Sequence, residues 1–430
     1  MTKMLETIHT SKQMPKSTTV VVIGGGIVGV AAALTLAERD IPVVLIEKDQ
    51  IGCEQSSRNL GWIRKTSRYA KDIPLALAAD SIWASMPERI DSPVGYRREG
   101  IMFLAKDEAQ LGLYDEWLKS VAGFKLGSRL LSTAEIDQRV PGGNKKWAGA
   151  VYTGSDGYAE PAVATTAMAR AAMKKGAVVL QNTAVRTLVT RAGKVTGVVT
   201  ENGSIDCDQV ILAGGAGSRR FLGNMGIKLS TLPLICSVVR TSAIDGPTLS
   251  AVGGPDFSFR KHQDGGYIIT QRGALKAPLT LDHLLLGYQY LDQLKNQRNF
   301  LRIALDRTFI EDLKLARRWS STSVSPFEKV RVNNPATVTE LNQEAMQNLR
   351  AAWPAFNQAQ IAEAWAGLID VTPDSNPVID NIDALPGLTV ATGFSGHGFG
   401  TGPAAGQLAA DLATNASPLV DPSPYRFDRF

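Results

Sequence analysis

Residues 19–48 read TVVVIGGGIVGVAAALTLAERDIPVVLIEK, and this stretch decides the fold. The run at 20–23 is apolar and β-branched, which predicts a strand buried on both faces, as in the centre of a parallel sheet. The Ala- and Leu-rich run at 27–39 predicts a crossover helix, and the apolar run at 43–46 predicts a second strand. This order predicts a βαβ unit with parallel strands.

Three glycines mark the turn between the first strand and the helix. Gly24, Gly26 and Gly29 form G-x-G-x-x-G, which permits a tight turn, a close approach of backbone to a pyrophosphate, and close packing of helix on strand. Glu47 ends the second strand, where its carboxylate can accept hydrogen bonds from ribose hydroxyls and would repel a 2′-phosphate. The sequence therefore predicts a Rossmann-like site for an adenine dinucleotide other than NADP. The alternative is a glycine-rich turn without a ligand.

Length and composition bound the protein class. The chain has 430 residues, too many for one compact core, so two or three domains are expected. The net charge of +5 comes without a long basic run, so we expect no nucleic-acid partner. Neither cysteines nor histidines show ligand spacing, so we expect no disulfide framework, no metal site and a reducing, cytoplasmic compartment. The cysteines are Cys53, Cys207 and Cys236, and the histidines outside the glycine-rich motifs are His9, His262 and His283.

The first 18 residues are polar and basic, without the apolar centre of a secretory signal, and predict a disordered tail. The apolar and small residues at 20–36 include glycines and begin at a strand, so we expect no transmembrane segment.

Later segments show a second type of sequence. The sequence pattern changes at 95–105, which suggests that the chain leaves the first domain there. The pattern changes again in the region 222–343. An Asp-Gly-Gly turn at 264–266 predicts a β-hairpin, and 281–318 looks helical and amphipathic. We expect a second domain built on a sheet.

Two further glycine-rich turns follow apolar strands. A strand at 209–213 runs into Gly214 and Gly215, and a strand at 388–391 runs into a glycine-rich loop at 393–402. We expect a helix to begin near Pro403, and a helix N-terminus after a glycine loop favours an electron-rich group.

Three of these segments together resemble one family. They are VVVIGGGIVGVAAALTLAERDIPVVLIEK, VILAGGAGS and ATGFSGHGFGTGPAAGQLAADL, and the chain from about residue 18 resembles the FAD-dependent D-amino-acid oxidase/dehydrogenase superfamily, which includes glycine oxidase, sarcosine oxidase and D-amino-acid dehydrogenases. The resemblance implies a discontinuous, Rossmann-like FAD-binding domain and an inserted α+β substrate domain on a mostly antiparallel sheet. The implied segments are a tail at 1–18, FAD-binding parts at 19–92, 153–221 and 344–430, and substrate-domain parts at 93–152 and 222–343.

The resemblance also implies which residues hold FAD. One group would bind the adenosine and phosphate half, a second would run beside the flavin ring, and a third would face its pyrimidine edge. The first group is Gly24, Gly26, Gly29, Glu47, Lys48, Val185, Gly214 and Gly215; the second is Ser56, Ser57, Arg58 and Asn59; the third is Gly396, His397, Gly398 and Gly400.

Two departures from the family pattern affect the prediction. Many sarcosine oxidase relatives carry a cysteine near the position of Gly367 that bonds the flavin covalently. Glycine cannot form this bond, so we expect noncovalent FAD. The substrate-binding arginine of many amino-acid oxidases is replaced here by Ile369, which cannot pair with a carboxylate. Asp370 beside it resembles polyamine and opine oxidases, although a turn cap is an equally good interpretation.

The implied reaction is oxidation of a CH–NH bond to an imine by hydride transfer to flavin N5, followed by hydrolysis. The substrate would be an amino acid or related amine, and the acceptor oxygen or a quinone. Candidate catalytic residues are His397, Arg58 and Asp370; Arg64 and Arg68 are further candidate carboxylate anchors, and Arg260, Tyr267 and Trp62 are weaker candidates.

Alternative functions stay open. The chain can instead be the FAD-carrying subunit of a multi-subunit opine or amine dehydrogenase, or a polyamine-type amine oxidase. A tRNA-modifying flavoprotein is disfavoured, because it would need a dense basic face. A homodimer or heteromeric complex, and a peripheral position at the inner membrane face, are both compatible with the sequence.

Overall fold

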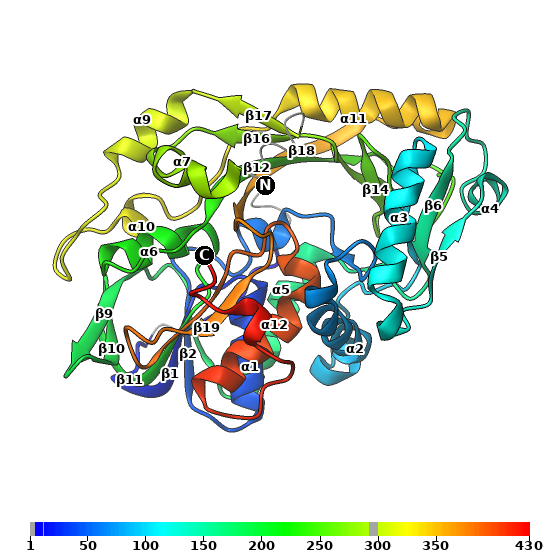
Figure 1. Ribbon diagram of the computed structural model, residues 1–430. Coiled ribbons are helices and arrows are strands. Elements are labelled where there is room, and N and C mark those ends of the chain that lie inside the picture. Colours follow the sequence, from blue (N-terminus) through cyan, green and yellow to red (C-terminus); the bar gives the residue numbers. More distant parts are fainter. Residues whose placement is uncertain (1–4, 12, 292–299) are drawn as a thin grey trace.

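Two β-sheets with covering helices make up the molecule (Figure 1). The computed structural model describes residues 5–11, 13–291 and 300–430. The eight-stranded sheet has the order β19-β20-β11-β1-β2-β8, with β9 and β10 extending from β11. Its strands are β1 (Ser17–Ile23), β2 (Val43–Ile46), β8 (Val178–Leu180), β9 (Val185–Arg191), β10 (Lys194–Thr200), β11 (Gly203–Leu212), β19 (Val378–Asn381) and β20 (Leu388–Thr392).

The centre of this sheet is parallel, as the opening motif predicts. β1 pairs in parallel with β2 on one side and with β11 on the other, and Val21 lies opposite Val44 and Val210. These side chains are fully or almost fully buried, which is why the strand sequences are continuously apolar rather than alternating.

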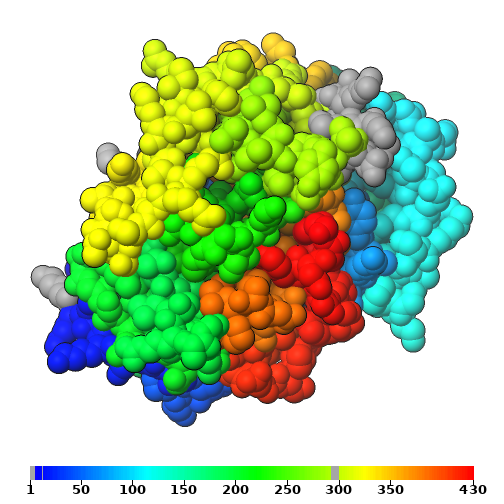
Figure 2. All heavy atoms as spheres, turned by 60° about the vertical axis from the view of Figure 1, so that its left-hand side comes forward, coloured from blue at the N-terminus to red at the C-terminus, as the bar shows by residue number. Residues whose placement is uncertain are grey.

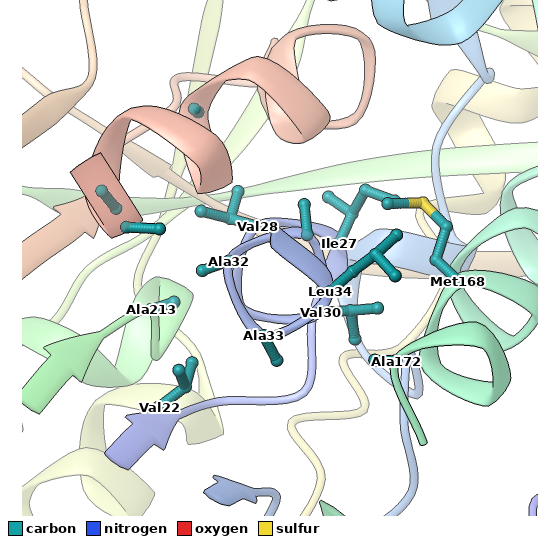
Figure 3. Close-up of a cluster of buried hydrophobic side chains, with 14 of the residues drawn as sticks. Val22, Ile27, Val28, Val30, Ala32, Ala33, Leu34, Met168, Ala172 and Ala213 are labelled. Carbon is teal, nitrogen blue, oxygen red and sulfur yellow. The ribbon is translucent and has the colours of Figure 1, made fainter. Parts of the chain in front are cut away.

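Helices from distant parts of the chain cover one face of the sheet. α1 (Ile27–Glu38) is buried at every position from 27 to 37, so its sequence is apolar all round. Figure 3 shows it between Val22 of β1 and the side chains Met168 and Ala172 of α5 (Pro161–Lys174). α12 (Gly398–Ala413) also packs on α1 and begins at Gly398, earlier than the predicted start near Pro403.

The second sheet has ten strands and is mostly antiparallel. Its order is β17-β16-β12-β15-β14-β13-β4-β6-β5, and β18 pairs along the other edge of β12. The strands are β4 (Ile101–Ala105), β5 (Ser128–Leu131), β6 (Gly149–Thr153), β12 (Leu232–Thr241), β13 (Ala251–Gly253), β14 (Ser258–Lys261), β15 (Tyr267–Thr270), β16 (Leu275–Pro278), β17 (Leu301–Ala304) and β18 (Ile361–Val371). A small sheet pairs β3 (Trp62–Ile63) with β7 (Gly157–Tyr158).

The remaining helices flank this framework. α11 lies across the second sheet, with α3 and α4 at one end and α7 and α9 at the other (Figure 1). The helices are α2 (Ile73–Ile90), α3 (Glu108–Ser120), α4 (Thr133–Arg139), α6 (Ser218–Asn224), α7 (Leu281–Leu286), α9 (Arg307–Lys314), α10 (Pro326–Lys329) and α11 (Thr339–Ala352). In the described part of the chain, none of the helices combines the length and apolarity needed to cross a membrane.

Three predictions of local structure need correction. Residues 361–371 form β18 of the second sheet, although they were assigned to the third FAD-binding segment, because the whole strand pairs with β12. β17 interrupts the stretch predicted as helical, since Leu275 pairs with Leu301 at the sheet edge. Residues 5–11 of the predicted tail pack on the first domain, with Ile8 buried in its core.

Candidate functional site

A cavity opens where the carboxyl ends of β1, β2 and β11 meet. Ligands of open α/β sheets bind at this edge, because the strand ends leave a crevice between their loops. Most residues predicted to hold FAD line this cavity. They are Gly24, Gly26, Glu47, Lys48, Ser56, Asn59, Val185, Gly214, Gly215, Gly396 and Gly398, joined by Asp370.

Five predicted site residues do not line the cavity. Two are glycines that allow close packing: a Cβ on Gly29 would lie 2.0 Å from the Gly24 carbonyl oxygen, and one on Gly400 would lie 2.6 Å from the Trp62 carbonyl oxygen. These glycines act by packing one element on another rather than by direct contact with the cavity. The others are Ser57, Arg58 and His397.

Glu47 holds the glycine turn. One carboxylate oxygen accepts a hydrogen bond from the Gly25 N–H at 2.7 Å, and the other accepts one from the Asp49 N–H at 2.9 Å. Burial raises the pKa of Glu47, and these N–H donors together with Lys48 oppose the rise. The carboxylate thus orders the turn while it lines the cavity, and each oxygen keeps a lone pair for a ribose hydroxyl.

Lys48 is paired with another residue that lines the cavity. Its Nζ lies 2.7 Å from Glu54 Oε1. Burial alone would lower the pKa of Lys48, but the charges of Glu54 and Glu47 outweigh it and raise the pKa. The lysine remains charged and fixed in place.

The N-terminus of α1 is held from a neighbouring loop. The Ile27 N–H donates to the Ser56 Oγ at 2.9 Å, and a Cβ on Gly26 would meet only that same Oγ, at 3.1 Å. Space therefore remains in front of Gly26, where the backbone of a dinucleotide-binding turn approaches the pyrophosphate.

Asp370 is a brace for the second glycine loop. Its Oδ2 accepts hydrogen bonds from the Thr392 hydroxyl at 2.9 Å and from the Gly393 N–H at 2.6 Å. Burial raises the pKa of Asp370, and the same donors oppose the rise. These contacts agree with the turn-cap interpretation of this residue. The contact of Asp370 with substrate stays a prediction.

A polar atom that the sequence prediction missed points to a bound polar group. Gln55 lines the cavity, and its Oε1 is buried without a hydrogen-bond partner in the described part of the chain. A Cβ on Gly367 would lie 2.1 Å from this oxygen, so glycine at that position makes room for the amide. A flavin ring carries an N–H donor at N3, which is a chemical match for such an acceptor. Together with the glycine turns, Gln55 makes this cavity fit FAD.

Two arginines converge on one aromatic ring beside the glycine loop. The guanidinium carbon of Arg272 lies 4.0 Å from the centre of the Phe103 ring, and that of Arg64 lies 5.4 Å from it. In the described part of the chain, neither arginine has a carboxylate partner. Burial lowers the pKa of Arg64 to about 9, and the charges of Arg68 and Arg272 add to this effect. The more distant carboxylates of Asp156 and Asp72 oppose this fall, but neither forms an ion pair with Arg64 or Arg272.

His397 belongs to this arginine cluster rather than to the cavity wall. Its Nε2 lies 3.1 Å from Arg64 Nη2. Burial lowers its pKa well below the ordinary value, and the charges of Arg68 and Arg64 lower it further, so the imidazole is neutral. Arginine can only donate, so Nε2 accepts and the ring proton is on Nδ1.

The other predicted anchors have structural partners. Arg58 donates to the carbonyl oxygens of Cys53, Asn333 and Ala366, and Arg68 is paired with Asp72. Their hydrogen bonds hold loops together. Arg64, which donates to the Thr66 carbonyl oxygen and to His397, is the one of these three candidate anchors that lies over Phe103 beside Arg272.

The weaker candidates are also occupied or packed. Arg260 forms a two-pronged ion pair with Glu160, with both contacts at 2.8 Å. Tyr267 donates to the Thr248 carbonyl oxygen at 3.0 Å. Trp62 packs on Phe103 with ring centres 5.6 Å apart, and its Nε1 is buried without a partner among the described residues.

Arg272 was missed from the sequence. It stands two residues after the end of β15 and has no motif around it. A basic residue at the end of a sheet strand was the available signal, and only its position over Phe103 distinguishes it from a surface arginine. Among the described residues, no group of His, Cys, Asp and Glu side chains could hold a metal ion.

Comparison with known proteins agrees with this geometry. Residues 19–412 match the family model DAO, FAD dependent oxidoreductase. Glycine oxidase of Pseudomonas aeruginosa is 25% identical over 421 residues, covering 94% of this chain and 97% of that protein. Sarcosine oxidase subunit beta of Rhizobium meliloti is 22% identical over 418 residues, covering 96% and 88%.

The solved structure of L-amino acid deaminase from Proteus myxofaciens, in complex with anthranilate, superposes with a TM-score of 0.95. It is 32% identical, with 99% of this chain and 96% of that chain covered. These comparisons confirm the fold class and the resemblance that the three glycine-rich segments indicate. The chain belongs to the DAO family of FAD-dependent oxidoreductases, enzymes that act on amino acids and amines.

Proposed function

We propose that this enzyme binds FAD noncovalently and oxidises the amine-bearing carbon of an amino acid with a free carboxylate. The observation that carries the proposal is the pair Arg64 and Arg272 over the Phe103 ring, with no carboxylate to neutralise it in the described part of the chain. A partly buried guanidinium without an ion-pair partner is costly, so an anionic ligand is the expected partner. Arginine is well suited to it, because its planar group can hold a carboxylate through two parallel hydrogen bonds.

The flavin, when bound, accepts the hydride from the substrate carbon and leaves an imine that water hydrolyses to the oxo product and ammonia or an amine. The protein residues bind and orient. Gly24, Gly26 and Glu47 would hold the adenosine and phosphate half, and Gln55 would contact the flavin ring. The N-terminus of α12 at Gly398 would face the electron-rich edge of the ring, where its free N–H groups and helix dipole stabilise negative charge.

The same arginine pair disfavours a polyamine substrate. A cationic chain would be repelled by Arg64 and Arg272, and the acidic residue that suggested polyamines, Asp370, is engaged with Thr392 and Gly393. The likeness to glycine oxidase and to L-amino acid deaminase supports an amino acid in the same position.

A substrate panel under anaerobic conditions tests the proposal. The purified holoenzyme is mixed with L-amino acids, D-amino acids, N-methyl amino acids and polyamines, and bleaching of the oxidised flavin absorbance is recorded. We expect bleaching by amino acids of one stereochemical series and none by polyamines. Bleaching by polyamines alone would overturn the assignment of the arginine pair.

A second candidate function is that of an FAD-carrying subunit in a multi-subunit amine dehydrogenase. The likeness to sarcosine oxidase subunit beta favours it. The isolated chain with an amino acid and an artificial electron acceptor decides between the two. Steady turnover supports the free-standing enzyme, with oxygen or a quinone as its acceptor, and flavin reduction without turnover supports the subunit.

A further inference from the structure

A segment between α9 and α11 forms part of the cofactor cavity. Residues 325–333, which we call the strap, contain α10, and Phe327 of the strap lines the cavity. Its ring packs on that of Phe221, another lining residue, with ring centres 6.1 Å apart. In Figure 1 α10 lies beside α6, and in Figure 2 the yellow atoms of this part of the chain lie against green ones. The strap therefore adds a side chain to the cavity wall that the family resemblance did not assign.

Polar contacts fasten the strap to the loop after β2. Lys48 and Glu54 of that loop both line the cavity. The Lys48 carbonyl oxygen accepts a hydrogen bond from Arg331 Nη1 at 2.7 Å, and Glu54 Oε1 accepts one from the Asn333 N–H at 2.9 Å. Two residues of the cavity wall thus receive hydrogen bonds from the strap.

Two ion pairs fasten the strap near the predicted adenine site. Arg186 donates to both carboxylate oxygens of Glu328, at 2.9 and 2.8 Å, and Arg331 Nη1 lies 2.9 Å from Glu201 Oε1. The Arg186 guanidinium holds the pKa of Glu328 at about 2, so this pair is charged at neutral pH. Arg186 directly follows Val185, which lines the cavity. The ion pairs therefore hold the strap at the adenosine end of the cavity.

The backbone on both sides of the strap is irregular. Residues 320–324 and 334–338, which the structure describes in full, form neither helix nor strand. The start of the strap is ordered by a capping box, in which Ser325 and Glu328 each accept a hydrogen bond from the other's N–H. A short ordered piece that has irregular flanks and is held by polar contacts can open as a unit.

We propose that the strap controls access to the cofactor cavity and sets the rate at which FAD enters and leaves. Glu328 and Arg331 fasten the strap, but neither lines the cavity. Weakening their contacts should therefore speed both entry and release and leave the affinity for FAD nearly unchanged. The proposal rests on the noncovalent FAD binding proposed above and adds which part of the chain admits the cofactor.

FAD exchange measures how often the strap opens. The holoenzyme is mixed with an excess of radiolabelled FAD, and uptake of the label gives the release rate. Fluorescence of free FAD after serial dilution of the holoenzyme gives the dissociation constant. Glu328→Gln removes the charge but keeps an oxygen for the capping box, and Arg331→Gln breaks the pair with Glu201. We expect each variant to exchange FAD about fivefold faster, the upper end for a partly exposed ion pair, with a nearly unchanged dissociation constant.

A double variant tests the ion pair between Arg186 and Glu328. Arg186→Gln should match Glu328→Gln, and the double variant should exchange FAD no faster than either, because both changes remove the same pair. Added salt should speed exchange in the wild type more than in the double variant.

Glu135→Gln is the matched control. Glu135 is likewise the capping-box residue of a short helix, α4, and it pairs with Arg129 at 2.6 Å. Neither residue lines the cavity, so this variant should exchange FAD as the wild type does.

Three results would overturn the proposal. The first is exchange at the wild-type rate in both Glu328→Gln and Arg331→Gln. The second is equal acceleration by Glu135→Gln. The third is a dissociation constant that rises by the same factor as the release rate, because the contacts would then shape the bound site without controlling entry.

Acid precipitation of the same samples separates this proposal from the one on which it rests. Flavin that stays with the precipitated protein contradicts noncovalent binding, and the role of the strap with it. Flavin that is released, together with unchanged exchange in the strap variants, contradicts the strap alone and leaves the proposed FAD site as it stands.

Discussion

Arg64 donates to His397, with 3.1 Å between Nη2 and Nε2. The guanidinium comes from the segment after β3 and the imidazole from the glycine loop before α12, so this contact joins the arginine cluster to the cavity wall. Because His397 is neutral and accepts the hydrogen bond, it orients Arg64 without adding positive charge.

Replacing Arg272 should weaken substrate binding. Arg272→Ala removes one of the two cations over Phe103, and we expect kcat/KM for the preferred amino acid to fall roughly 10- to 150-fold, since a hydrogen bond to a charged group contributes about 1.5–3 kcal/mol. Arg272→Lys should recover part of the loss. Arg139→Ala is the matched control, because Arg139 also covers an aromatic ring, that of Tyr152 at 4.3 Å, and does so away from the cluster. Equal losses in both alanine variants would remove Arg272 from the site.

Replacing His397 tests positioning against catalysis. His397→Ala should raise the substrate concentration needed for half-maximal flavin reduction about tenfold, while FAD content stays normal. A tenfold change corresponds to the loss of one hydrogen bond at the upper end of its usual net free energy, about 1.5 kcal/mol. His397→Gln should restore binding in part, because its amide oxygen can accept from Arg64. Stopped-flow reduction measures both effects. A fall of about 100- to 1,000-fold in the limiting rate would show instead that His397 stabilises charge on the flavin directly.

The glycine turn predicts which substitutions lose the cofactor. Gly26→Val should abolish FAD binding, because its branched side chain would fill the space in front of the turn. Gly29→Ala should lose FAD and stability together, since its Cβ would lie 2.0 Å from the Gly24 carbonyl oxygen and push α1 away from β1. Gly112→Ala, in open space on α3, is the control and should keep full FAD content. Retention of FAD by Gly26→Val would contradict the placement of the pyrophosphate.

Acid precipitation should release all of the flavin into the supernatant. Gly367 cannot form a thioether, and a larger residue there would displace Gln55. Cys53 lines the cavity, but burial raises the pKa of its thiol and disfavours the reactive thiolate. Cys53→Ser should therefore behave as the wild type in this assay. Yellow colour that stays with the precipitated wild-type protein would show a covalent link.

Glu160 should make the fold sensitive to acid. Burial would raise the pKa of its carboxyl, but Arg260 and His262 outweigh burial and hold the pKa below its ordinary value of 4.5. The ion pair therefore contributes full stability above pH 4.5 and loses it as the pH falls through the lower pKa of the folded state. Glu160→Gln should lower the free energy of unfolding by about 3–5 kcal/mol at neutral pH.

Denaturant unfolding of Glu160→Gln across acidic and neutral pH measures this contribution. The variant should show a flatter dependence on pH than the wild type, because it lacks the titrating group. Asp115→Asn, which breaks an exposed pair with Lys119, is the control and should leave stability nearly unchanged. Parallel pH curves for wild type and Glu160→Gln would contradict the role of the pair.

The sequence by itself determined the cofactor-binding half of this protein. Gly24, Gly26 and Gly29 stand between two apolar runs, and each feature depends on residues close together in the chain: strand, turn, helix and the acidic end of β2. Such local patterns are set by backbone conformation and burial, which sequence periodicity reports directly. The later glycine loops also follow apolar strands, and the family resemblance implied that they hold the same cofactor.

Only the tertiary structure decided the arginine pair and the edge of the second sheet. Arg64 and Arg272 meet over Phe103 from three separate segments, and nothing in the neighbourhood of any of them encodes that meeting. No strand was predicted at 361–371, and these residues were placed with the FAD-binding segments, because a sequence pattern does not show which strand a segment pairs with. Which strands pair, and which charges lack a partner, depends on contacts between residues far apart in the chain. These contacts form only when the chain folds.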